Sequence, residues 1–113
     1  MGRRDDLIAL YATELSDKCG VTPDMDLLTK VAIGLGPALY RDDATTVAAS
    51  DPDELARVRT GFLQKKLGLA AGPDLDAGIA AAVATYGQSN RNKHRAVFYY
   101  LLVKHFGRES AYA

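Results

Sequence analysis

An unbroken run of eight apolar residues near the C-terminus, AVFYYLLV at 96–103, constrains the fold of this chain more than any other segment. A helix that is apolar on every face must be enclosed by other elements, because any exposed face would put apolar surface into water. The run is too short to span a membrane, which takes roughly 20 apolar residues. The sequence therefore predicts a C-terminal helix over 89–107 that is buried by the rest of the protein.

Apolar spacing and residues typical of helix ends predict four further main helices. They cover residues 5–19, the segment from Pro23 to the stop at 34–37, residues 52–67 and residues 73–86, with a short helical turn at 37–40. Thr22 is the expected cap of the second helix, and Asp51 with Glu54 forms a predicted capping box at the third. No segment alternates apolar and polar residues, so we expect no sheet. The predicted fold is all-α, a compact bundle of five main helices in a single domain over residues 1–113.

Similar segments recur about 50 residues apart and predict an internal repeat. LSDKCGV at 15–21 precedes PDMD at 23–26, and LQKKLGL at 63–69 precedes PDLD at 73–76. The chain is thus interpreted as two helix-loop-helix repeats followed by the buried C-terminal helix. Gly61 and the small residues of the fourth helix predict close helix crossings, because glycine inside a helix costs about 1 kcal/mol relative to alanine.

The single cysteine and the composition of the N-terminal segment indicate the cellular compartment of the protein. Cys19 is the single cysteine, so no internal disulfide can form, and the N-terminal segment has no long apolar stretch typical of a secretory signal. The sequence therefore predicts a cytoplasmic protein with no membrane partner. Cys19 stands at a helix carboxyl end, where the dipole disfavours a thiolate, so we expect an unreactive thiol.

The net charge is zero, but the charges are unevenly distributed. Residues 1–56 hold five basic and eleven acidic residues, a net charge of −6, whereas residues 57–113 hold nine basic and three acidic residues, a net charge of +6. One interpretation is that the two halves face each other and neutralise one another in the fold. The other is that a basic face binds an anionic partner. We favour the first, because scattered charges commonly serve solubility.

The basic start of the C-terminal helix is the main candidate site. Cations at the amino end of a helix are unfavourable by roughly 0.3–1 kcal/mol each, so these residues require compensation. Acidic residues of the N-terminal half are the favoured partners, and a bound phosphate or nucleic acid is the alternative. The candidate residues are Ser89, Asn90, Arg91, Asn92, Lys93 and Arg95, with Arg57, Arg59, Lys65 and Lys66 as an extension.

Two pairs of aspartates form a second candidate site, for a divalent metal. The pairs are Asp24 with Asp26 and Asp74 with Asp76. Oxygen ligands suit such cations, but acidic residues in a first helical turn are also what the helix dipole favours, and we prefer that structural role. The two histidines, at 94 and 105, lie about 16 Å apart along a helix, too far to share a metal.

No motif assigns an enzymatic role: the sequence contains no phosphate-binding glycine loop, no paired-cysteine motif, no zinc-protease motif and no nucleophile elbow. We therefore expect no catalytic residue and no cofactor. The favoured function is a non-catalytic interaction or adaptor module with an unknown protein partner, or one that forms a homo-oligomer. Phosphate or nucleic-acid binding is the alternative, and metal binding is the third.

Four stretches carry a family resemblance: TPDMDLLTKVAIGLGP, AASDPDEL, GPDLDAGIAA and SNRNKHRAVFYYLLVKHFG. With them, the chain from about residue 5 to residue 112 resembles a family of small bacterial proteins known as domain of unknown function 2853. The resemblance implies a small soluble bacterial protein with no assigned activity. It carries over no catalytic or ligand-binding residue.

Overall fold

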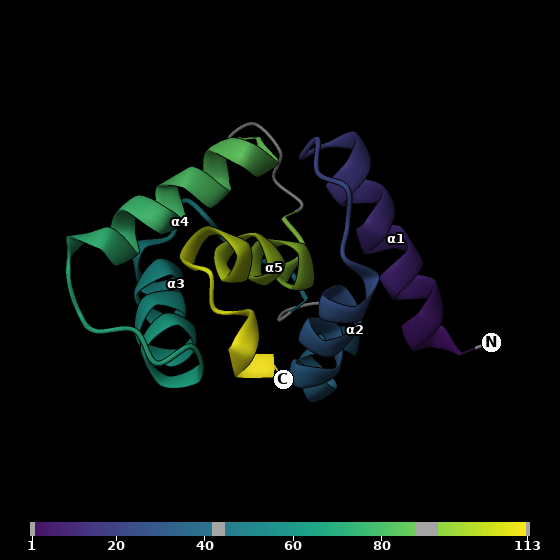
Figure 1. Cartoon of the computed structure of the whole chain (residues 1–113), viewed down its shortest axis with the longest axis horizontal. Helices are drawn as coiled ribbons and strands as arrows, with labels where there is room; N and C mark the ends of the chain where they lie inside the picture. The colour runs from purple at the N-terminus through teal and green to yellow at the C-terminus, as the bar shows by residue number, and fades with distance from the viewer. Residues whose placement is uncertain (1, 42–44, 88–92, 113) are drawn as a thin grey trace.

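The helix α5 (Arg95–Phe106) occupies the centre of the molecule, as the apolar run predicts. A computed structural model describes residues 2–41, 45–87 and 93–112. In this structure α5 packs against α4, α2 and α1, and the other elements are arranged around it (Figure 1). Seven of its twelve residues are buried: Ala96, Val97, Phe98, Tyr100, Leu101, Leu102 and Val103.

Two helices and a short turn cover one side of α5 (Figure 1). They are α1 (Arg3–Asp17), α2 (Met25–Gly34) and the 3₁₀ turn η1 (Gly36–Tyr40). Ile8, Tyr11 and Leu15 recur at helical spacing on α1 and are buried in the core. The chain leaves α1 through Gly20, whose φ of +66° lies in the left-handed region that glycine adopts readily.

The other side of α5 is covered by a helix that changes its hydrogen-bonding pattern and by α4 (Figure 1). The α-helical segment α3 (Pro52–Arg57) continues directly into the π-helix η2 (Val58–Lys66), and α4 (Pro73–Tyr86) follows. At the end of η2, Leu67 N donates to Phe62 O, a bond over five residues. The C-terminal 3₁₀ turn η3 (Glu109–Tyr112) returns to lie against α2.

The predicted all-α bundle is confirmed: the described residues contain five main helices and no strand. The bounds of α4 agree with the prediction, because Pro73 and Gly87 mark its two ends. A uniform α-helix over 52–67 is wrong, since its second half is a π-helix. The internal repeat stays a prediction.

The predicted start of α2 is wrong. Asp24, not Thr22, is the cap: its carboxylate accepts a hydrogen bond from Leu27 N at 3.2 Å. The backbone N–H of Asp24 donates to the Tyr100 hydroxyl at 2.8 Å, which holds Asp24 in an extended conformation outside the helix. Asp74, at the matching place in PDLD, lies instead within the first turn of α4.

Two glycines show opposite outcomes for the predicted helix crossings. A Cβ added to Gly78 would lie 2.2 Å from Phe106 Cζ, so the close approach of α4 to α5 depends on this glycine. A Cβ added to Gly61 would have no atom within 4 Å, so the predicted crossing at Gly61 is wrong. Gly61 instead lines a surface hollow.

Helix length also bears on the membrane. Across residues 2–41, 45–87 and 93–112, no helix combines the length and the apolar character needed to cross a bilayer.

Candidate functional site

The predicted helix start at Ser89 is wrong. α5 begins at Arg95, with His94 as its cap residue in an extended conformation. The reason is a short antiparallel pairing with the loop before α3: Val47 N donates to Lys93 O at 2.8 Å, and Arg95 N donates to Thr45 O at 2.7 Å. This pairing uses the backbone groups of 93–95 in an extended segment.

The candidate phosphate-binding residues divide into two groups. Ser89, Asn90, Arg91 and Asn92 lie outside the described residues. Lys93 is buried, with 3% of its surface exposed, and burial lowers the pKa of its amine. Arg95 is also largely enclosed, with 15% of its side chain exposed. The two described cations of this site therefore point into the protein rather than toward solvent.

Arg95 is neutralised within the fold. Its guanidinium donates to the buried carboxylate of Glu54, to the Tyr99 hydroxyl at 3.0 Å and to the Thr46 carbonyl at 3.3 Å. Burial acts to lower the pKa of Arg95, but Tyr99 and Glu54 raise it overall. The expected internal pairing between the acidic and basic halves of the chain is thus confirmed for Arg95, because Glu54 belongs to the acidic half.

A second buried polar cluster joins α1, α4 and the start of α5. The Tyr86 hydroxyl donates to the Glu14 carboxylate and accepts from the backbone N–H of His94 at 3.0 Å. His94 Nδ1 lies 2.7 Å from Glu14 Oε2, although the two atoms are not aligned for a hydrogen bond. Burial, followed by the Glu14 contact, raises the pKa of Tyr86 far above its ordinary value. The hydroxyl therefore stays protonated and serves as a donor to a buried carboxylate.

The paired aspartates take the roles expected from helix ends. Asp24 caps α2, Asp26 pairs with Lys30 at 3.2 Å, and Asp76 pairs with Arg59 at 2.8 Å. Asp74 lies in the first turn of α4, where the dipole favours an acid. In the part of the chain that the structure describes, no three His, Cys, Asp or Glu residues could hold a metal ion together.

The histidines and Cys19 differ in their surroundings. His94 packs its ring against Tyr11, with centroids 5.2 Å apart, whereas His105 is exposed at the end of α5. The helical spacing of the two histidines predicts partly buried rings at the edge of an apolar stripe, which is wrong for His105. Burial and the nearby Glu14 carboxylate raise the pKa of the Cys19 thiol to about 11, in agreement with an unreactive thiol.

A surface hollow between α2, η2 and η3 brings cations and aromatic rings together. Its volume is about 260 Å³, and it is called the Arg57–Lys66 hollow below. It is lined by Gly34, Leu35, Arg57, Gly61, Phe62, Lys66, Tyr99 and Tyr112. The rings of Phe62 and Tyr99 stack with centroids 3.8 Å apart, and Lys66 Nζ lies 4.5 Å from the centroid of the Tyr112 ring. Phe62 is buried and the two tyrosines are partly exposed, so a ligand in the hollow would meet cations beside aromatic rings, a combination enriched at protein interfaces.

The π-helix and two glycines shape this hollow. Gly61, Phe62 and Lys66 all come from η2, and π-helical segments are rare and frequently lie at functional sites. Gly34 allows close packing against Tyr112, because a Cβ at Gly34 would lie only 3.3 Å from Tyr112 Cε1. Burial, with a contribution from Tyr99, raises the pKa of Tyr112 to about 12, so its hydroxyl is a neutral hydrogen-bonding group at ordinary pH.

A second hollow lies on the other side of Tyr112 and has the opposite charge. It also measures about 260 Å³ and is lined by Asp24, Asp26, Leu27, Lys30, Glu109, Ser110 and Tyr112. Three carboxylates and one amine give this acidic hollow a negative charge. Tyr112 therefore separates a positively charged hollow from a negatively charged one.

Comparison with known proteins gives a family but no activity. The sequence model of a family described as "Protein of unknown function (DUF2853)" matches residues 10–110. The chain belongs to this family. The match confirms the resemblance carried by the four quoted stretches, all of which fall within it. None of the curated proteins matches the sequence.

The sequence indicated part of the Arg57–Lys66 hollow in this DUF2853 protein. Arg57 and Lys66 were among the candidate anion-binding residues, and Gly61 was singled out for the wrong reason. Gly34, Tyr99 and Tyr112 were missed, because they come from elements far apart in the chain. One usable signal was present: Gly61 lies inside a predicted helix, four residues after Arg57 and five before Lys66, and a glycine inside a helix is costly and so indicates a special role.

Proposed function

We propose that this protein is a non-catalytic interaction module that binds an acidic segment of a partner protein in the Arg57–Lys66 hollow. The observation that carries the proposal is the lining of the hollow, in which two cationic side chains stand beside three aromatic rings. Arginine and aromatic residues dominate the binding energy of protein interfaces, particularly where they form a pocket for an anchoring side chain.

The charge of the hollow supports an acidic ligand. Glu54 is shared by two guanidiniums, those of Arg57 and Arg95, so one carboxylate faces two positive charges. The side chain of Arg57 is 67% exposed, so it can turn toward a ligand with little change in its burial. Arginine binds carboxylates through two parallel hydrogen bonds, and Lys66 adds a second positive charge.

The size of the hollow supports a side chain rather than a large cofactor. A volume of about 260 Å³ is slightly below the roughly 300–1,000 Å³ of pockets that enclose drug-sized ligands. It suits one or two side chains of a peptide, and the open space beside Gly61 lets a backbone approach closely.

The acidic hollow beyond Tyr112 favours a protein partner over a nucleic acid. A phosphate backbone that occupied the Arg57–Lys66 hollow and continued past Tyr112 would meet the carboxylates of Asp24, Asp26 and Glu109. Repulsion between like charges disfavours that arrangement. A peptide can instead carry an acidic residue for one hollow and a basic residue for the other, and such complementary charges also provide specificity.

The buried polar clusters support a non-catalytic role. Glu14, Tyr86 and His94 contact one another inside the protein, and Glu54 contacts Arg95. In these positions the titratable groups hold separate helices together. Such buried networks commonly specify a single arrangement of a core.

The proposal is tested by NMR titration of the ¹⁵N-labelled protein with the blocked peptide Glu-Glu-Phe-Gly-Lys-Lys. We expect shifts concentrated at the amides of Gly34, Gly61 and Tyr112, and their loss in the double variant Arg57→Gln, Lys66→Gln. The control is Lys18→Gln, which removes an exposed cation at the end of α1.

Three results would contradict the proposal. Shifts confined to other surfaces would place binding elsewhere. Equal binding of the all-lysine peptide of the same length would show that the hollow does not select acidic groups. Salt-sensitive binding of a single-stranded oligonucleotide at the same amides, tighter than that of the peptide, would favour the nucleic-acid alternative instead.

A further inference from the structure

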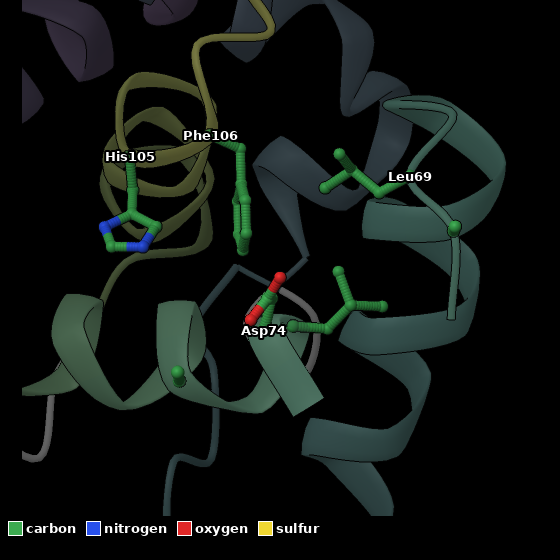
Figure 2. Close-up of a pocket in the computed structure, with 7 residues that line it drawn as sticks. Leu69, Asp74, His105 and Phe106 are labelled. Carbon is green, nitrogen blue, oxygen red and sulfur yellow. The ribbon is translucent and has the colours of Figure 1, made fainter. Parts of the chain in front are cut away.

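A larger cavity lies at the carboxyl end of α5 and shares no lining residue with the Arg57–Lys66 hollow. Its volume is about 440 Å³, within the range of small-molecule pockets. Three segments form it: the loop after η2, the first turns of α4 and the last turn of α5 (Figure 2). Its lining residues are Leu69, Ala70, Asp74, Leu75, Ala77, His105 and Phe106.

One wall of this cavity is held in place by close packing. The Phe106 ring lies against α4 at Gly78, where a Cβ would come within 2.2 Å and 2.5 Å of two ring carbons. His105 meets the Phe106 ring edge-on, with centroids 4.9 Å apart and planes at 82°. The aromatic wall is therefore formed before any ligand arrives, which lowers the cost of ordering on binding.

The polar groups of the cavity are few and differ in kind. Figure 2 shows the side chains of Asp74, Phe106 and Leu69 directed toward a common space, with the His105 imidazole to one side. The remaining lining residues are aliphatic. An apolar cavity with a small number of polar groups is the usual form of a ligand site.

The electrostatics favour a positively charged ligand. Asp74 supplies a carboxylate from the first turn of α4. The carboxyl end of α5, which ends at Phe106, adds the partial negative charge of its last carbonyls. The face of the Phe106 ring offers a further attraction for a cation.

We propose that this cavity binds a small organic cation, a primary amine with an aliphatic or aromatic body. The ammonium group pairs with Asp74 and faces the end of α5. The body of the ligand packs between Leu69, Leu75 and Phe106, and the His105 imidazole supplies a hydrogen-bonding group at the rim. This site is separate from the Arg57–Lys66 hollow and does not depend on the function proposed for it.

The test compares two probes of similar shape and opposite charge, 2-phenylethylamine and phenylacetate, by NMR titration of the full chain. We expect the amine to bind with a millimolar dissociation constant and to shift the amides of Ala77, Gly78 and Phe106. Phenylacetate should bind at least about tenfold more weakly, as expected for the loss of an ion pair of about 1.4 kcal/mol. Equal binding of the two probes, or binding of phenylacetate alone, would overturn the proposal.

Two variants locate the site. Asp74→Asn should remove the preference for the amine, while Asp76→Asn, which alters an acid paired with Arg59, should leave it unchanged. Ala77→Leu places a larger side chain at the cavity wall and keeps a strong helix former in α4, so it should block both probes. Unchanged amine binding in both Asp74→Asn and Ala77→Leu would refute the assignment. Because the Arg57–Lys66 hollow is unaltered, the acidic peptide should still bind every variant.

Discussion

Removing the Tyr86 hydroxyl tests the buried cluster that fixes the start of α5. In the Tyr86→Phe variant, the Glu14 carboxylate loses its hydroxyl donor and the backbone N–H of His94 loses its acceptor. A hydrogen bond to a charged group contributes about 1.5–3 kcal/mol, and leaving a buried polar group unsatisfied costs about 1–3 kcal/mol. Because His94 still contacts Glu14, we expect a total loss near the lower end, about 3 kcal/mol.

The measurement is equilibrium unfolding in urea, followed by far-ultraviolet circular dichroism. A loss of about 3 kcal/mol corresponds to a fall in Tm of roughly 13 °C for a domain of this size. The matched control is Tyr40→Phe, which removes a hydroxyl from an exposed tyrosine and should change stability by less than about 0.5 kcal/mol. In a Glu14→Gln background, the cost of Tyr86→Phe should fall by about 1 kcal/mol, because the two groups are coupled. A loss of stability in Tyr86→Phe no larger than in the control would show that the Tyr86 hydroxyl does not stabilise the buried cluster.

Three further predictions concern packing, charge pairing and ionisation. Gly78→Ala should lower the free energy of unfolding by about 1–3 kcal/mol, because the added Cβ collides with an aromatic ring. In Gly61→Ala the added Cβ meets open space, so the free energy of unfolding should stay unchanged or rise by about 0.5 kcal/mol. Urea unfolding of the two alanine variants measures this difference. Arg95→Met should lower the free energy of unfolding by about 3 kcal/mol, because the buried Glu54 carboxylate keeps only Arg57 as a partner. The double variant Arg95→Met, Glu54→Leu should recover most of that loss, because replacing both members of a buried ion pair by apolar residues is often nearly neutral. Cys19 should react with iodoacetamide near pH 8 about 100-fold more slowly in the folded than in the unfolded protein, and equal rates would contradict the raised pKa. Since its pKa rises from 9.0 to about 11 on folding, the contribution of the thiol to stability is complete below pH 9 and is lost as the pH rises toward 11.

Local chemistry made parts of the fold predictable from sequence. Proline and glycine mark both ends of α4, and its predicted bounds agree with the structure. The apolar run at 96–103 required a buried segment, because an exposed face would put apolar side chains into water, and the absence of alternating segments left no sheet for it to join. In both cases the deciding information lies within a few residues of the element.

Contacts between distant segments explain what the sequence did not predict. α5 begins at Arg95 because its preceding residues pair with the loop at 45–47, a partner that no local pattern indicates. Asp24 became a cap because Tyr100, 76 residues away in the chain, accepts its backbone N–H. PDMD and PDLD therefore start their helices at different positions despite their similar residues.

In the candidate site, too, local features were predictable from the sequence and contacts between distant segments were not. The opposite charges of the two halves predicted internal pairing, but the sequence could not say that Glu54 would be the partner of Arg95. Tyr99 belongs to the run predicted to be buried, and no pattern in the sequence marked Tyr112. They line the Arg57–Lys66 hollow because η3 folds back onto α2 and η2 remains open at Gly61.

A crystal structure of the protein with the peptide Glu-Glu-Phe-Gly-Lys-Lys tests the proposed interaction most directly. We expect a peptide carboxylate between Arg57 and Lys66, the phenylalanine in contact with Tyr99 or Tyr112, and the lysines facing the acidic hollow. A peptide bound on another surface, or with its lysines in the Arg57–Lys66 hollow, would contradict it.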